Sequence, residues 1–322
     1  MQRVQQGFTL LELLVVITLL ALLATAGLVA YEGIGESAAD TAAANNIKSA
    51  DSAIRTFRAV ENVYPNQWDN LANLGGEIGA TAGGAFSVLA EPTRNFFGQW
   101  EVDSTDAVAQ AILVSLGSVG VTELQTLTTA AALPTGLAPN EFFNESAPGM
   151  AVGTEADEIE WELDDGTFDS VNEAEFFVSV VPSSNGTGCS AGGNPLNVNF
   201  AGTTVTDSLP LNRINDNLDN DGCHVVVAVG FGKDVPGTTL DSKVAISTAP
   251  TYSNGNIVNP SQHYARYIAL FHVASDREVD EVTPGDGVIQ ANEVLPKARL
   301  LAVVDTEGRN IDQAIAGAFA SN

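Results

Sequence analysis

Basic residues are scarce in this sequence, and their scarcity limits the partners that the protein can have. Lysine and arginine total 13 among 322 residues, against 40 aspartates and glutamates, which gives a formal net charge of −27. Nucleic acids and anionic lipid surfaces attract positive protein surfaces. The composition therefore argues against both as partners of the folded part of the chain, and it favours cations.

Several catalytic signatures are absent as well. The sequence has no Walker loop, no H-E-x-x-H motif, no C-x-x-C motif and no Cys/His zinc pattern. No repeat of fixed period is visible, which argues against solenoid folds. Residues 188–192 (G-C-S-A-G) match the G-x-S-x-G string of serine hydrolases, but loop-forming residues replace the strand and helix that this mechanism needs. His224, His263 and His272 lie singly in apolar or strand-like surroundings, so we expect no enzyme.

One long apolar run is present at residues 8–29, and it carries a single charged side chain, Glu12. About 20 apolar residues suffice for a helix to cross a bilayer. A carboxylate inside such a helix costs about 3 kcal/mol on insertion scales, so a partner or a function is expected for it. Residues 1–7 are polar and end in Gly7. Cleavage after Gly7 would leave Phe8 as a new N-terminus, with Glu12 one helical turn away.

Two simpler interpretations of this run compete. A secretory signal peptide would explain the small residues at 24–26 (A-T-A). However, the run is longer than the roughly 7–15 residues usual for such a peptide, and its basic region is only Arg3. A simple membrane anchor is the other alternative, but an anchor has no use for Glu12.

The stretch G-F-T-L-L-E-L-L-V-V-I resembles the class III signal of type IV pilins and type II secretion pseudopilins. In this family a prepilin peptidase cuts after the glycine and methylates the new amine, and the helices then leave the membrane and bundle into a filament core. The resemblance implies that Gly7 is the cleavage residue and Phe8 the methylated terminus. It also implies that Glu12 faces the amine of a neighbouring subunit.

Residues 53–74 look like the segment that follows the helix in major pseudopilins and related pilins. That segment has an aromatic residue in the last helical turn, an Asn-x-Tyr-Pro turn and a leucine-containing helix. The matching residues are Phe57, Asn62, Tyr64, Pro65, Leu71 and Leu74. The resemblance ends near residue 74, so it leaves the role of the head open.

The predicted N-terminal helix covers residues 8–60, because no proline precedes Pro65. It is roughly 80 Å long, and residues 8–29 form its membrane or filament-core part. Its second half is amphipathic, with apolar side chains at steps of three and four that we expect to face the head. These are Ala43, Ile47, Ala50, Ile54 and Phe57.

The rest of the chain predicts a folded head, since hydrophobic residues make up 45% of the sequence and charged ones 16%. We expect an α+β fold, with a mixed helical part at 61–135, a linker at 133–153 and a β-rich, mainly antiparallel part at 154–322. Predicted helices cover 105–116, capped by Ser104, and 123–133, opened by Thr122 and Gln125. Predicted strands are 158–163, 175–181, 225–231, 244–248, 264–273 and 298–304, before a helix at 311–319.

A head outside the membrane lies in an oxidising environment, so the only two cysteines, Cys189 and Cys223, are expected to form a disulfide bond. Two buried free thiols are the alternative.

Calcium is the cofactor that the head sequence suggests, in a structural role. Residues 217–222 (N-L-D-N-D-G) fit the first half of an EF-hand-type loop, with oxygen ligands at Asn217, Asp219 and Asp221. Asp286 and Glu293 supply the opposite half of such a loop around Gly287. A solvated acidic turn is the alternative, because these residues are also common in turns.

The sequence therefore predicts a structural subunit of a type IV pilus-like extracellular filament, located as a single-pass protein in the inner membrane before assembly. Its expected partners are copies of itself, the prepilin peptidase and the inner-membrane assembly machinery. One alternative is a major-type pseudopilin in a periplasmic pseudopilus, which the Asn-x-Tyr-Pro turn favours and the large head disfavours. A minor pilin or tip adhesin that binds a ligand through the acidic head is a second alternative.

The calcium hypothesis predicts that a chelator lowers the melting temperature of the chain lacking residues 1–29. Extracellular calcium modules bind at about 10⁻⁴–10⁻³ M, so millimolar calcium should restore the melting temperature. An unchanged melt, with Asp219→Ala and Asp221→Ala also silent, would identify these residues as turn formers only.

Overall fold

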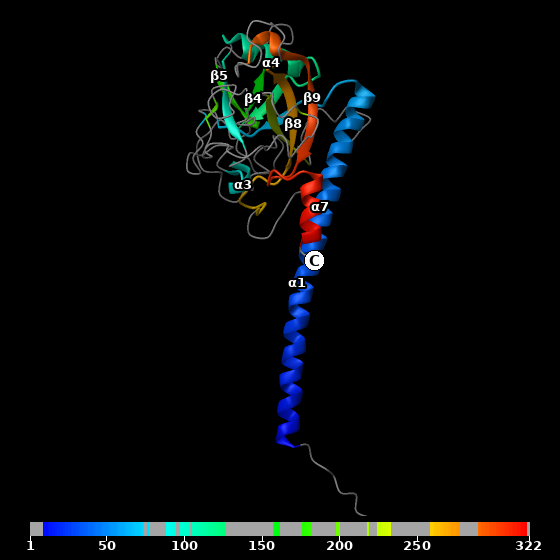
Figure 1. The fold of residues 1–322 in the computed structure, drawn as a ribbon. Helices are drawn as coiled ribbons and strands as arrows, with labels where there is room; N and C mark the ends of the chain where they lie inside the picture. Colours follow the sequence, from blue (N-terminus) through cyan, green and yellow to red (C-terminus); the bar gives the residue numbers. More distant parts are fainter. Residues whose placement is uncertain are drawn as a thin grey trace, which may run out of the picture.

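The protein has a long N-terminal helix that stands beside a head built on one large sheet (Figure 1). The structure is a computed structural model, and it describes residues 9–73, 76, 88–94, 97–103, 105–126, 157–161, 175–181, 198–199, 218, 224–232, 258–276 and 289–320. The helices are α1 (Leu10–Glu61), α3 (Glu91–Arg94), α4 (Ala107–Gly117), the 3-10 helix η2 (Ala291–Glu293) and α7 (Ile311–Ala320). The strands are β1 (Trp68–Asn70), β2 (Gly98–Asp103), β3 (Glu123–Thr126), β4 (Asp157–Glu160), β5 (Glu175–Val181), β6 (Val198–Asn199), β7 (His224–Phe231), β8 (Tyr267–Ser275) and β9 (Val294–Val304).

Helix α1 is continuous over 52 residues, which confirms the predicted long helix to within a residue at its C-terminal end. It ends at Glu61, where Asn62 adopts the left-handed conformation (φ 65°) and donates its backbone N–H to the carbonyl of Arg58 at 2.9 Å. The left-handed cap satisfies one of the last free carbonyls of the helix. Helix α1 therefore ends before Pro65, and the left-handed conformation of Asn62 ends it.

The predicted apolar stripe of α1 is buried against the head. Its five side chains are at most 7% exposed, and they are Ala43, Ile47, Ala50, Ile54 and Phe57. Tyr64 fastens the end of the helix, because its hydroxyl accepts the Leu300 N–H at 3.1 Å and its ring packs edge-on against Phe271. Burial of this stripe joins α1 to the sheet.

The sheet follows the order β4-β3-β1-β7-β5-β2-β6, and β8 joins β7 to β9. Strand β7 pairs with β8 along one edge and with β1 and β5 along the other. Every residue of β7 and β8 is buried, which is why these strands read as continuous apolar runs. The β1–β3 pair is parallel and the other strand pairs among the described residues are antiparallel, so the sheet is mixed and mainly antiparallel. The α+β class is confirmed.

The predicted helix at 123–133 is wrong over Glu123–Thr126, which forms β3 between β1 and β4. Asn66 explains the difference, because its side-chain oxygen accepts the N–H groups of Thr122 and Glu123 at 2.9 and 3.0 Å. Its amide nitrogen also donates to the Thr122 hydroxyl at 2.9 Å. A distant residue thus takes the groups that a helix cap would use.

Two other helical expectations also change. The leucine-containing helix expected after the Asn-x-Tyr-Pro turn is replaced by β1, where Trp68 is fully buried and its Nε1 donates to the Pro65 carbonyl at 2.6 Å. Helix α4 begins at Ala107 with Asp106 as its cap, whose carboxylate accepts the Val108 N–H at 3.0 Å. Ser104, the predicted cap, lies outside the described residues.

The remaining predictions for the second half of the chain agree with the structure where it describes them. Strands β4, β5, β7, β8 and β9 and helix α7 occupy the predicted places, with β8 beginning at Tyr267 and β9 at Val294. The predicted strand at 244–248 and the linker at 133–153 lie outside the described residues. Strand β2 was not predicted, although its sequence G-Q-W-E-V-D alternates as a half-buried strand does.

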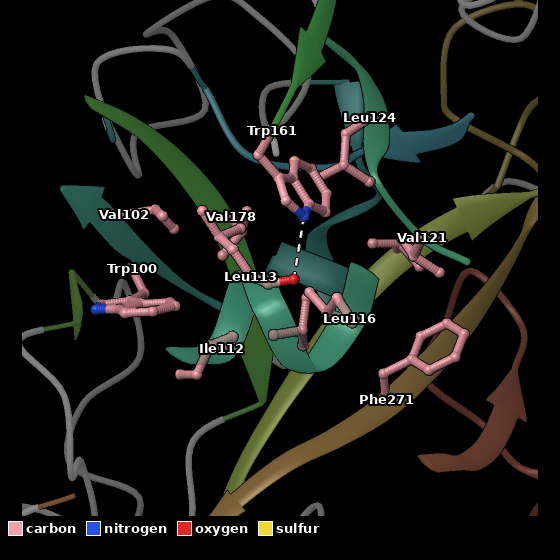
Figure 2. Close-up of a pocket in the computed structure, with 12 residues that line it drawn as sticks. Trp100, Val102, Ile112, Leu113, Leu116, Val121, Leu124, Trp161, Val178 and Phe271 are labelled. Carbon is pink, nitrogen blue, oxygen red and sulfur yellow. Dashed lines mark hydrogen bonds between the residues drawn. The ribbon is translucent and has the colours of Figure 1, made fainter. Parts of the chain in front are cut away.

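Helix α4 packs on the sheet through an apolar layer that holds a void of about 10 Å³ (Figure 2). A void of this size has room for one water at most, and its lining offers no polar surface to hold one. The Trp161 Nε1 donates to the Leu113 carbonyl at 3.0 Å across this layer. Helix α4 is therefore a packing helix, as predicted.

Candidate functional site

The first half of α1 is bare of contacts with the head, and its surface is apolar. Residues Leu10–Leu28 have a mean hydropathy of 2.4, and none of this window is buried. By length and composition the helix can cross a membrane. Its leucines, valines and isoleucine are about half or more exposed, up to 84% for Leu10. Water disfavours such a surface, so it needs lipid or other helices around it.

The neutral polar side chains in this half satisfy themselves within the helix. The Thr18 hydroxyl donates to the Val15 carbonyl at 2.9 Å, and the Thr25 hydroxyl donates to the carbonyls of Ala21 and Leu22 at 2.9 and 3.0 Å. Such internal bonds suit an apolar environment, where water cannot complete them. Glu12 is then the one ionisable side chain between Thr9 and Leu28.

Glu12 lies in the first turn of α1 and forms a capping box with Thr9. Its Oε2 accepts both the backbone N–H and the hydroxyl of Thr9 at 2.9 Å, and its own N–H donates to the Thr9 Oγ1 at 3.3 Å. This arrangement satisfies N–H groups that the first turn leaves open. The sequence analysis predicted a role for Glu12 but not the capping role of Thr9, although T-x-x-E is a recognisable capping signal. Gly7 and Phe8 lie outside the described residues.

The comparisons with known proteins identify this same segment. Residues 2–28 match the family model of the prokaryotic N-terminal methylation motif. The chain carries an N-terminal methylation motif. With the apolar helix behind it, this motif fits the class III signal of type IV pilins and pseudopilins. Comparisons with curated proteins and with solved structures found no match.

The methylation motif leads into α1, and helix α7, near the C-terminus, packs against the side of α1. Helix α7 lies along α1 just beyond the apolar half (Figure 1). Arg309 precedes α7 and reaches three carboxylates, at 3.1 Å to Asp40 of α1, 3.0 Å to Asp305 and 3.1 Å to Glu307. This cluster ties the base of the head to the helix that bears the motif.

The turn before α7 is organised around the buried Asp305. Its Oδ1 accepts the N–H groups of Glu307 and Arg309 at 2.9 and 3.0 Å. Burial raises the pKa of Asp305, and the nearby guanidinium of Arg309 opposes that rise. Helices α1 and α7 approach each other closely at Gly317. A Cβ added to this glycine would lie 2.9 Å from Asp40 Oδ2. No local pattern in the sequence indicates these long-range contacts.

A second buried ion pair lies in the head, between Asp69 of β1 and Arg266, which are 0% and 3% exposed. The Asp69 Oδ2 accepts from Arg266 at 2.8 Å and from the Tyr264 hydroxyl at 2.6 Å. Burial raises the pKa of Asp69, while Arg266 and Tyr264 oppose that change. Gly230 faces Asp69 across the sheet, and any Cβ there would collide with the Tyr264 hydroxyl. We interpret this cluster as structural.

Most residues of the predicted metal and disulfide sites lie outside the described residues, namely Asn217, Asp219, Asp221, Asp286, Cys189 and Cys223. Glu293 is described, and its Oε2 accepts the Gln290 N–H at 2.8 Å in η2. Within the described ranges no group of three or more His, Cys, Asp or Glu residues is arranged to hold a metal ion. Calcium binding and the disulfide bond stay predictions.

Two of the three histidines meet at a serine. Ser275 Oγ lies 2.9 Å from His224 Nδ1 and 2.8 Å from His272 Nε2, and Arg299 contacts His272 Nδ1 at 3.0 Å. Because the arginine can only donate, His272 Nδ1 must accept, and its Nε2 carries the proton toward Ser275. His272 in this state donates to Ser275, and the Ser275 hydroxyl can in turn donate to His224 Nδ1.

We expect Arg309→Ala to lower the free energy of unfolding by about 1–3 kcal/mol, because it leaves the buried Asp305 without its opposite charge. Urea unfolding of the chain lacking residues 1–29 measures this. Arg55→Ala is the matched control, since Arg55 pairs with Asp51 at 2.8 Å on an exposed helix face. Such pairs are worth about 0.3–0.5 kcal/mol. Equal effects of the two substitutions would mean that Arg309 does not fasten α1 to the head.

Proposed function

We propose that this protein is the structural subunit of a type IV pilus-like extracellular filament, processed after Gly7 and assembled through α1. The observation that carries the proposal is the bare apolar half of α1, with the methylation motif at its start and Glu12 as its one ionisable side chain. A helix that remained in lipid would gain nothing from that carboxylate. A helix that packs against identical helices gains a partner for it.

The partner would be the methylated amine of Phe8 on a neighbouring subunit. In the single chain, Glu12 already holds the groups of Thr9 through Oε2. Its other oxygen, Oε1, makes no hydrogen bond to the described residues, and the side chain is exposed. An incoming ammonium group can therefore pair with Oε1 while the capping box stays closed. In apolar surroundings an opposite charge within a few Å offsets much of the cost of the carboxylate.

Pairing of this kind would also fix the axial register of neighbouring subunits. Apolar helix surfaces alone tolerate sliding, whereas one buried charge pair is satisfied at a single offset. The head then follows, since Arg309 and the buried stripe fasten it to α1. The protein would work by assembly, without turnover of a substrate. It would begin in the inner membrane and end in the filament.

Two alternative functions share this mechanism. A major-type pseudopilin would form a periplasmic pseudopilus, and a minor pilin or tip adhesin would bind a ligand through the acidic head. Copy number distinguishes the alternatives, because filaments sheared from cells should consist almost wholly of the major subunit. Imaging of sheared filaments with mass spectrometry of their composition measures it. A trace amount of this chain in such filaments would favour the adhesin.

We expect Glu12→Ala to be inserted and cleaved normally but to build few filaments, because the Phe8 amine loses its partner. Glu12→Gln should fail in the same way, since it keeps the shape and loses the charge. Counting filaments and measuring the processed chain that stays in the membrane test this directly. Thr18→Val is the control, because it alters a hydroxyl that bonds only within the described helix. Normal filaments from both Glu12 variants would contradict the proposed mechanism.

A further inference from the structure

The face of α1 that points away from the sheet carries charge of the opposite sign to the chain as a whole. Its positions recur at helical spacing, and every one is exposed. We name it the outer stripe, and it consists of Thr41, Asn45, Lys48, Ser52, Arg55 and Ala59. By helical spacing it lies on the side of α1 opposite the buried stripe.

The basic residues of the chain are concentrated around the outer stripe. Residues 41–60 hold Lys48, Arg55 and Arg58, three of the 13 basic residues, and only one of the 40 acids, Asp51. Arg55 pairs with Asp51, and Arg58 stacks over the Tyr64 ring at 4.3 Å. Lys48 is exposed and makes no ion pair with the described residues. This segment is therefore net positive, while the whole chain is at −27.

We propose that the outer stripe docks against the acid-rich head of a second copy of this chain, with Lys48 facing a carboxylate of that copy. This inference rests on the proposed function, because it concerns contacts within the filament. Heads of strongly negative charge repel one another when they are stacked. A negative head that faces the positive outer stripe of its neighbour is attracted to it. Complementary charge of this kind sets the orientation of partners.

The placement of the stripe fits this occupant. It continues the same helix that bears the apolar half, so a neighbour packed on Leu10–Leu28 lies beside it as well. Lys48 is 20 residues beyond Leu28, which is roughly 30 Å along the axis. The described part of the head has exposed acids that could face Lys48, among them Glu91, Asp106, Glu160 and Asp312.

Zero-length carbodiimide coupling of filaments tests the contact, because it joins an amine to a carboxylate only where the two groups touch. Filaments grown from a mixture of isotopically heavy and light chains reveal links between subunits. We expect peptides in which Lys48 of one chain is joined to an acidic residue of another. Links of Lys48 only within its own chain, or only to a different protein, would overturn the proposal.

Charge reversal provides the second test. We expect Lys48→Glu to reduce filament number at least tenfold and to leave the amount of processed chain in the membrane unchanged. Lys297→Glu is the matched control, since Lys297 is also exposed and the change in net charge is the same; filament number should stay within twofold. Normal filament number with Lys48→Glu would overturn the proposal.

The outcomes separate this inference from the proposed function. If the unaltered chain builds no filament, both the proposed function and this inference are wrong. Filaments that form without the Lys48 link refute this inference alone.

Discussion

The burial of one face of α1 against the sheet is the interaction on which the rest of the structure depends. The stripe from Ala43 to Phe57 is buried against the head, while the apolar half of the same helix is uncovered. One continuous helix thus holds a folded head in water and exposes a surface that water disfavours. The head does not shield that surface, so it needs lipid or other helices around it.

The fastening of the helix to the head is polar as well as apolar. Arg309 joins Asp40 of α1 to the turn around Asp305, and Tyr64 receives a backbone N–H from β9. These contacts link residues more than 200 positions apart in sequence. They fix the orientation of α1 relative to the sheet.

The sequence predicted best where one local pattern decides the structure. The stripe of α1, the buried strands β7 and β8 and helix α7 all follow from periodicity that their surroundings do not oppose. The prediction was wrong at β3. There Asn66, which is distant in sequence, hydrogen-bonds the backbone N–H and the hydroxyl of Thr122, the residue predicted to open a helix. For the site, periodicity and the signal resemblance indicated Glu12. The T-x-x-E capping pattern is a local signal for Thr9 as well. The role of Arg309 depends on long-range contacts, which no single-sequence pattern reveals.

The most direct test is the intact mass of the mature protein taken from membranes or filaments. Cleavage after Gly7 predicts a chain that begins at Phe8 with a methylated amine and keeps all of α1. A chain that begins at Gly27 would have lost the apolar half of α1 to a signal peptidase. That result would contradict assembly through this helix, because neither Glu12 nor its neighbouring amine would remain.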